Sequence, residues 1–301
     1  MSRLVAIPPI PPPTGEVLDP LGLLQSVESL VQSGSVVLPS WRRQVRLHNS
    51  APLGDIRSQA PLVPVGAADG IQRRRVVTVR NRRPVWLVAV AAGVASDTDL
   101  KVGEMNLYLA GSHLDETWMR QRPGGFPTVV LDAIEPSTVV ADFDHVVQGH
   151  RWQLEARVVR TAAERGTVVV DGSISRYTAE HGDRVVGVVK SLATPYLTDE
   201  SELHRLGEGC CSQTFTIPAE RRPHLDRHSC FLRLHDAGPN DSLFGVVRLE
   251  AVDPEQLAPL AAWAYNQRQG PGSGDPRWPV HLVPVAWVER VLRARLDRFW
   301  R

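Results

Sequence analysis

Short apolar runs separated by polar turns predict three β-strands between residues 61 and 95. The first strand covers residues 62–68, the second residues 75–80 and the third residues 85–91. Residues 81–84 join the last two strands, and because they include an asparagine and a proline we expect a hairpin there. The third run is apolar at nearly every position, which is typical of a strand covered on both faces of a sheet.

A long helix and two further strands are predicted after the hairpin. Apolar residues at helical spacing indicate a helix over residues 136–165, with Ser137 as its N-cap. The apolar stripe of this helix comprises Phe143, Val147, Leu154, Val158 and Thr161. Valine-rich runs predict strands at residues 168–170 and 184–190, whereas residues 97–135 give no clear pattern. The order strand, hairpin, helix, strand favours an α/β fold with an RNase H-like mixed sheet core and flanking helices.

The N-terminal part of the chain is expected to form an arm outside this core. Residues 7–14 are rich in proline and predict an extended segment, and residues 17–33 have the apolar spacing of a helix. This helix could mediate dimerisation or pack on its own domain, and the sequence leaves both readings open. We therefore expect a proline-rich arm and helix in residues 1–58 and a second domain in residues 59–301.

The second domain is expected to consist of the core, residues 60–195, and a C-terminal embellishment, residues 196–301. Strands, helices and one flexible glycine- and proline-rich tract are predicted in the embellishment. The strand-like runs are residues 213–217, 230–234 and 243–251, the helices are residues 254–268 and residues 284–301, and the flexible tract is residues 270–276.

Two aspartates, Asp69 and Asp171, each follow an apolar run and precede a glycine. A carboxylate held at the end of a strand, beside a glycine that leaves room for ligands, is well suited to bind a hard divalent cation. Asp-Gly is also the commonest dipeptide of turns, so for either aspartate alone a turn is an equally good explanation. The pair is more specific, because adjacent parallel strands bring their ends within about 4.8 Å of each other.

A third acid, Glu155, lies on the predicted long helix. Its neighbours at helical spacing are Trp152, Val158, Val159 and Ala162, so it is expected to face an apolar interior. A buried glutamate needs a partner, which can be a metal ion or the guanidinium of a nearby arginine. Two strand-end aspartates and one helix glutamate are the acids of a metal-dependent phosphodiesterase with an RNase H-like core.

Phosphodiester hydrolysis requires an activated water, neutralisation of the charge that develops on the phosphate, and a stabilised leaving oxygen. Two divalent ions about 3.5–4 Å apart supply all three, and three or four carboxylates hold the ions. Lys190 ends a strand expected to lie beside that of Asp171. Its ammonium could contact the scissile phosphate or orient the attacking water, although an ordinary strand-end lysine is the alternative.

The charge balance limits how this protein could bind a polyanion. Thirty-four basic and thirty-three acidic residues give a net charge of +1, so any contact with DNA must come from local patches. Basic residues beside a metal site can hold phosphates on either side of the scissile bond, and a solvated hairpin is the alternative reading. The candidate DNA-binding residues are Arg73, Arg74, Arg75, Arg82 and Arg83.

Cysteine usage and hydropathy favour a cytoplasmic protein without membrane contact. The chain has three cysteines, two of them adjacent, which argues against a disulfide framework. Their spacing matches no common zinc site. The longest uncharged apolar run, residues 85–96, is shorter than the roughly twenty residues that span a bilayer. The N-terminal residues also lack the apolar length of a signal peptide.

Several motifs together resemble the NurA family of nucleases. Each motif is short, and their order and spacing carry the likeness, which covers residues 60–195 and continues more weakly through residues 244–250 and 278–282. The motifs are Ala68-Asp69-Gly70, the alanine- and valine-rich run 85–95, Glu155 on its helix, Val170-Asp171-Gly172-Ser173-Ile174 and Val186-Gly187-Val188-Val189-Lys190-Ser191.

The resemblance implies a manganese-dependent deoxyribonuclease with an RNase H-like fold, with Mg²⁺ as an alternative to Mn²⁺. Asp69, Glu155 and Asp171 would bind the metal, and Lys190 would act beside the phosphate. The family typically works as a homodimer docked on HerA, a hexameric ATPase that translocates DNA. This pairing implies a role in the resection and repair of DNA ends or in phage defence.

The chain departs from the family pattern at two places. A hydroxyl residue usually follows the first Asp-Gly, whereas Ile71 stands here. The family's C-terminal motif commonly ends in a histidine, which is absent at Ala286 and Trp287. We expect His281 either to substitute as the fourth metal ligand or to be a bystander.

Three functions compete on these observations. A metal-dependent DNA nuclease is the leading prediction, since an intact set of acids favours activity. The alternative is a catalytically degenerate subunit that keeps the fold for nucleic-acid binding or assembly. A strand transferase on the same core has less support, because the sequence shows no helix-turn-helix pattern.

Overall fold

A computed structural model of the protein describes most of the chain beyond residue 45. The described residues are 46–47, 52–80, 82–96, 99–111, 128–130, 139–177, 181–190, 196, 201–219, 226–236, 243–275 and 277–300. The chain divides into two compact units, residues 1–42 and 43–301, and all described residues belong to the second. The predicted N-terminal arm and helix, and the N-cap Ser137, lie outside the described residues.

The described strands and helices are as follows. The strands are β1 (Arg46–Leu47), β2 (Gly54–Asp55), β3 (Gly66–Arg80), β4 (Arg83–Ala95), β5 (Leu100–Gly111), β6 (Thr128–Val130), β7 (Val168–Asp171), β8 (Val185–Val189), β9 (Cys210–Cys211), β10 (Phe215–Ile217), β11 (Arg227–Arg233) and β12 (Val246–Ala251). The α-helices are α3 (Val139–Ala163), α5 (Ser201–Arg205), α6 (Leu257–Asn266) and α7 (Val283–Trp300), with short 3₁₀ helices at Ile174–Arg176, Gly182–Arg184 and Pro254–Gln256. The short strands β1 and β2 belong to the second unit.

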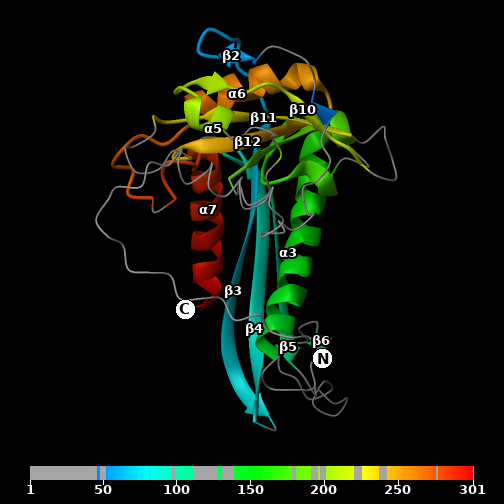
Figure 1. Ribbon diagram of the computed structural model, residues 1–301. Helices are drawn as coiled ribbons and strands as arrows, with labels where there is room; N and C mark the ends of the chain where they lie inside the picture. The colour runs from blue at the N-terminus through cyan, green and yellow to red at the C-terminus, as the bar shows by residue number, and fades with distance from the viewer. Residues whose placement is uncertain are drawn as a thin grey trace, which may run out of the picture. The chain divides into compact units, whose positions relative to one another are not determined.

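These strands form one mixed sheet (Figure 1). Its order is β1-β10-β11-β12-β8-β7-β3-β4-β5-β6, with β9 pairing β11 and β2 pairing β9. At the centre β3, β4 and β5 form an antiparallel meander, β7 pairs parallel with β3, and β8 pairs parallel with β7. This is the order and direction of the strands in an RNase H-like sheet, and the predicted fold class is confirmed.

The strand β3 differs from the prediction of two separate strands with a turn at Asp69-Gly70. It continues without a turn from Gly66 to Arg80, and Asp69 pairs with Gly93 of β4. The physical reason is that β4 offers a long apolar partner, so ladder hydrogen bonds keep the polar middle of β3 extended. Asp69 therefore lies inside a strand, and the prediction that it ends one was wrong. The predicted hairpin is confirmed, since Arg80 pairs with Arg83.

The strand β5 fills part of residues 97–135, a segment without a clear sequence pattern. Its first eight residues are exposed or only partly buried and include Lys101, Glu104 and Asn106, whereas its last four residues are buried. The polar half hides the periodicity by which a buried strand is usually recognised.

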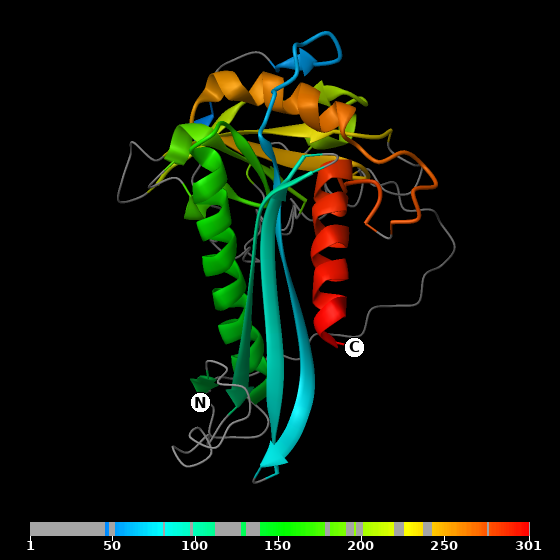
Figure 2. The same cartoon turned by 180° about the vertical axis from the view of Figure 1, so that it is seen from behind.

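One face of the meander is covered by α3 (Figures 1 and 2). Of the predicted stripe, Phe143, Val147, Leu154 and Val158 are buried in a core with alternate residues of β4. Thr161 was predicted wrongly. It is exposed, and its hydroxyl donates a hydrogen bond of 3.2 Å to the carbonyl oxygen of Arg157. Val159 and Ala162, on either side of it along the helix, are buried in this core instead.

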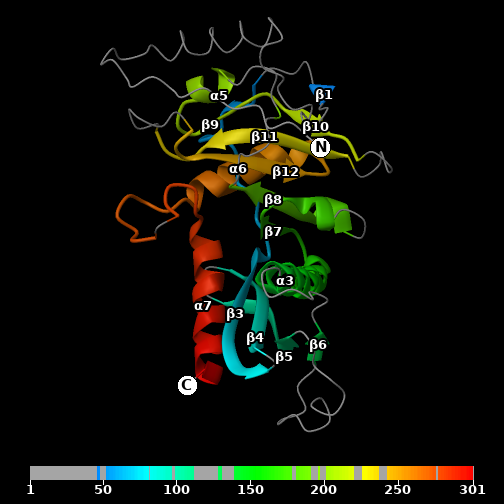
Figure 3. The same ribbon diagram turned by 60° about the horizontal axis from the view of Figure 1, so that its bottom comes forward.

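The opposite face is covered by α6 and α7 (Figure 3). Val288, Leu292 and Leu296 of α7 form a buried cluster with Ile71 of β3 and with alanines of β4. The helix α6 belongs to a second core with β7, β8, β11 and β12. Both helices were predicted within a few residues of their bounds. Among the described residues, no helix combines the length and the apolar character needed to cross a bilayer.

The C-terminal part of the chain extends the same sheet. β12 pairs antiparallel with β8, and β11 and β10 follow outward. The predicted strands at residues 230–234 and 243–251 correspond to β11 and β12, and the run at residues 213–217 contains β10. These strands place charged residues of β11 and β12 directly behind the turn that follows β7.

Two glycines give a paired test of this fold. A Cβ on Gly187 of β8 would overlap the backbone oxygen of Gly172, whereas a Cβ on Gly149 of α3 would meet no atom within 4 Å. We expect Gly187→Ala to lower the free energy of unfolding by about 1–3 kcal/mol through overpacking. Gly149→Ala should raise it by up to about 1 kcal/mol, because alanine favours helix. Urea denaturation of both metal-free variants measures the difference, and equal effects would contradict the close approach of β8 to the turn.

Candidate active site

Asp69 and Asp171 lie side by side where β7 ends. The parallel pairing of β3 with β7 runs through Ala68 opposite Val170, and the next step along both strands brings the two aspartates opposite each other. Strands in this register are about 4.8 Å apart. Side chains alternate along a strand, so Asp69 projects to the same face as Ile71, which packs against α7. Asp171 ends β7 as predicted.

Glu155 reaches the two aspartates from α3, across the position of Gly70. A Cβ on Gly70 would lie 3.0 Å from Oε2 of Glu155 and 3.2 Å from Cγ of Arg151, so only glycine leaves room for this approach. Glu155 is 5 % exposed, which confirms that it faces the interior. The hydroxyl of Tyr177 donates a hydrogen bond of 2.8 Å to its Oε1.

A fourth acid, Glu289 of α7, was missed by the sequence analysis. Its side chain hydrogen-bonds with that of Asp69. The signal was available, because Glu289 lies directly beside the apolar stripe of Val285, Val288 and Leu292, as Glu155 lies beside that of α3. The resemblance directed attention to a missing histidine at this end of the chain instead.

The four carboxylates influence one another strongly. Burial raises the pKa of Asp69 well above its ordinary value, and the charges of Asp171, Glu289 and Glu155 raise it further. Burial also raises the pKa of Glu155, against the opposing effects of Tyr177 and Arg151. For Glu289 burial acts in the same direction, but hydrogen bonds from Arg277 and Asp69 lower its pKa overall. Of the four acids, Asp69 is therefore the one whose neutral form the surroundings favour most.

Each of the other three acids faces a cation. Lys190 Nζ lies 2.7 Å from Oδ2 of Asp171, so the predicted proximity of this lysine to Asp171 is confirmed. Arg151 Nη1 lies 3.5 Å from Oε2 of Glu155 and donates a 2.7 Å hydrogen bond to the carbonyl of Gly70. Arg277 forms a two-pronged ion pair with Glu289, with Nη2 2.7 Å from Oε2.

His281 is fully buried behind Glu289 and Lys190. Its Nδ1 lies 2.5 Å from Oδ2 of Asp275, whereas its Nε2 has no hydrogen-bond partner among the residues that the structure describes. Burial and the charge of Lys190 lower the pKa of His281, which favours the neutral ring. A proton on Nδ1, donated to Asp275, leaves the Nε2 lone pair free, which is the tautomer of a metal-binding histidine.

The side-chain oxygen and nitrogen atoms of this site are of the kinds that bind a divalent cation. Their positions in this structure, however, do not form a set of metal ligands. Within the described ranges no three His, Cys, Asp or Glu side chains are arranged to hold a metal ion together. The side chains of Lys190, Arg151 and Arg277 occupy positions beside three of the acids. A bound ion would have to take over Asp171 and Glu289 from their cations. Four buried or half-buried carboxylates, those of Asp69, Glu155, Asp171 and Glu289, and the Nε2 of His281 are the donors available to it.

A buried ionic cluster supports the turn that carries Asp171. Glu250 of β12 is fully buried and accepts hydrogen bonds from Ser173 Oγ at 2.8 Å and from the backbone nitrogen of Ile174 at 3.0 Å. Arg248 and Arg227 balance its charge at 2.5 and 3.0 Å. Although burial acts to raise the pKa of Glu250, these arginines keep it below the ordinary value. Nothing in the sequence around β12 signalled this role.

The arginines predicted to bind DNA are dispersed. Arg73 and Arg74 project to opposite faces of β3 and pair with Asp297 of α7 and Asp144 of α3, while Arg75 is exposed. Arg82 and Arg83 lie at the tip of the hairpin that joins β3 and β4, as expected, roughly 35 Å from Asp69 at about 3.3 Å per residue. The five candidate DNA-binding residues therefore do not form one patch, because β3 continues past Asp69 without a turn.

The strand order and the four neighbouring acids define the class of protein. It is an α/β protein with an RNase H-like sheet and an acidic centre at the point where the pairing of β3 with β7 ends. No family model matches the sequence, and no curated protein matches it. The structure is similar to the NurA nuclease from Sulfolobus solfataricus, with a TM-score of 0.48, 10% identity, and 93% of this chain and 92% of that chain covered.

Two endonucleases V are also similar in structure. For the Bacillus subtilis protein the TM-score is 0.34 at 11% identity, covering 94% of this chain and 95% of that chain. For the catalytic domain of the human protein it is 0.34 at 12% identity, covering 96% and 99%. The fold class rests on the strand order itself, since likenesses at these values add little to it.

The raised pKa of Asp69 predicts a pH dependence. Below its unfolded value of 3.8 the residue is protonated in both states, but above it only the folded protein keeps the proton. The folded state then loses stability as the pH rises toward the raised pKa. We expect metal-free Asp69→Asn to gain stability relative to wild type as the pH rises above about 4. Thermal unfolding in chelator measures this, and a pH-independent difference would contradict a protonated Asp69.

Proposed function

We propose that this protein is a metal-dependent DNA nuclease that hydrolyses phosphodiester bonds. The observation that supports it best is the meeting of Asp69, Glu155, Asp171 and Glu289 at the edge between β3 and β7, with Lys190 beside them. Four neighbouring acids repel one another unless positive charge, from basic side chains or from a metal ion, balances them. The proposed ion is Mn²⁺, with Mg²⁺ as an alternative.

The metal would polarise the phosphate and lower the pKa of a bound water, as divalent ions do in two-metal hydrolases. Asp69 and Asp171 are the proposed shared ligands, because adjacent strands present them together. Glu155 and Glu289 approach from opposite faces of the sheet and would complete the set with His281. With Asp171 held by a metal, the ammonium of Lys190 would be free to contact the scissile phosphate or its attacking water.

The alternative is a nuclease-like subunit without activity. Its supporting observation is that Lys190, Arg151 and Arg277 already satisfy three of the acids without a metal. The two functions differ in a direct assay. The purified protein is incubated with linear single- and double-stranded DNA in the presence of Mn²⁺, Mg²⁺ or chelator. Metal-dependent cleavage supports the nuclease, and binding without cleavage supports the subunit.

Asp171→Ala tests the assignment of the acids. We expect cleavage to fall by about 10³-fold or more, because loss of a shared ligand removes several kcal/mol of transition-state stabilisation. Asp183→Ala, an exposed acid outside the site, is the matched control and should keep wild-type activity. Undiminished cleavage by carefully purified Asp171→Ala would show that the activity has another source.

We also propose that the chain acts as a homodimer with a HerA-type hexameric DNA translocase, in DNA-end resection and repair or in phage defence. The support is the sequence resemblance and the net charge of +1, which is poor for capturing DNA unaided. A motor that threads DNA past the site replaces weak diffusional capture with delivery at high effective concentration.

The partnership predicts weak, salt-sensitive cleavage by the protein alone and marked stimulation by the ATPase with ATP. Deletion of residues 1–34 should reduce dimerisation or docking more than it reduces metal binding. Light scattering measures dimerisation and docking. Cleavage assays with and without the ATPase measure the stimulation and the integrity of the metal site. A monomeric full-length protein whose cleavage is indifferent to the ATPase would exclude this arrangement.

A further inference from the structure

A groove lined by arginines adjoins the acidic centre. It is a cavity of about 300 Å³ bounded by Gly70–Arg73 of β3, by Gln148 and Arg151 of α3, and by Glu289 and Arg293 of α7. Its lining thus includes the acid Glu289 and, at Gly70, the neighbour of the acid Asp69.

The groove exists because β3 extends beyond the point where its pairing with β7 ends. β7 pairs with Gly66 to Ala68 only, and beyond them no described strand covers this edge of β3. The two helices lie on opposite faces of the sheet, and both can therefore reach the uncovered edge. Figure 3 shows α3 and α7 on either side of β3.

Three guanidinium groups line the groove, and they differ in how closely side chains and backbone atoms of the protein already hold them. Arg151 is held by Glu155 and the carbonyl of Gly70, and Arg73 pairs with Asp297, which also places a carboxylate near the groove. Arg293 is the least committed: its side chain is 60% exposed, and its Nη2 lies 3.6 Å from Glu289. The carboxylate of Glu289 would be neutralised in turn by a metal.

We infer that this groove is a subsite for a backbone phosphate of the DNA strand being cut, adjacent to the scissile phosphate. Guanidinium groups bind phosphate oxygens through forked hydrogen bonds, and no aromatic ring among the lining residues offers a surface for a base to stack on. The subsite therefore grips the backbone without reading sequence. The identity of the ligand rests on the proposed function, whereas the preference for phosphate does not require cleavage.

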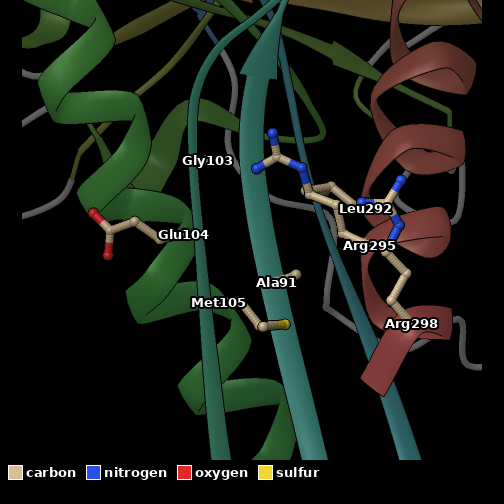
Figure 4. Close-up of a pocket in the computed structure, with 7 residues that line it drawn as sticks. All are labelled: Ala91, Gly103, Glu104, Met105, Leu292, Arg295 and Arg298. Atoms are coloured by element: carbon tan, nitrogen blue, oxygen red, sulfur yellow. The ribbon is translucent and has the colours of Figure 1, made fainter. Parts of the chain in front are cut away.

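A second cavity on the other side of α7 provides the control (Figure 4). It has about 390 Å³ and is lined by Leu292, Arg295 and Arg298 of α7 and by Ala91 and Met105 of the meander. Glu104 also lines it, but its side chain points toward α3, where it pairs with Arg157 at 2.7 Å. This cavity carries two arginines of the same helix but lies away from the acids.

The test compares two double variants of equal charge. Arg73→Gln/Arg293→Gln changes the groove, and Arg295→Gln/Arg298→Gln changes the control cavity. Binding of a fluorescent oligothymidylate is measured by anisotropy in chelator over a range of salt concentrations. We expect the groove variant to bind about 10-fold more weakly, with a salt slope reduced by about 0.7 for each lost phosphate contact, and the control to change less than about 2-fold. In Mn²⁺ the groove variant should raise KM with little change in kcat.

The outcomes separate this inference from the proposed function. Equal weakening by both variants, or by neither, overturns the subsite even where metal-dependent cleavage is found. Selective weakening by the groove variant supports the subsite even where no cleavage is found, in which case the nuclease proposal fails alone. If the double variant does not fold, as judged by circular dichroism, Arg293→Gln replaces it, because that side chain is mostly exposed.

Discussion

The end of β7 is the constraint on which the site depends. Its pairing with β3 stops at Ala68 opposite Val170, whereas β3 continues for twelve further residues along β4. This difference in length places Asp171 at a strand end beside Asp69 and leaves one edge of β3 uncovered. Helices on opposite faces of the sheet can meet only at such an edge. The acids of α3 and α7, and the groove between those helices, all follow from it.

Charge compensation is the second organising feature of the site. Lys190, Arg151 and Arg277 each balance one carboxylate, whereas burial and the neighbouring acids raise the pKa of Asp69. These ion pairs imply competition, because an ion that captures a carboxylate releases a cation. The released cations would then lie within reach of the substrate phosphates, so metal and substrate would favour each other's binding.

The sequence predicted those parts of the molecule that local periodicity determines. The long helix, the valine-rich strands and the interior position of Glu155 follow from apolar spacing, and all three are confirmed. Prediction from the sequence failed where pairing with a distant part of the chain overrides a local sequence signal. Asp69-Gly70 is a turn signal, but pairing with β4 keeps it extended, and the glycine serves instead to admit Glu155. Glu250 could not be found at all, since its arginines come from β11 and β12 and the turn it supports follows β7.

The position of Glu289 changes what the missing histidine means. The resemblance led us to look for an imidazole at the C-terminal end of the site, but the group beside Asp69 there is a carboxylate. His281 lies behind it, tied to Asp275, which in turn shares Arg277 with Glu289. Exchange of a nitrogen donor for an oxygen donor moves the set toward the ligands that Mn²⁺ and Mg²⁺ prefer and away from those of zinc. The departure from the NurA-like motif is therefore compatible with the proposed metal chemistry. The Nε2 of His281 has no hydrogen-bond partner among the described residues.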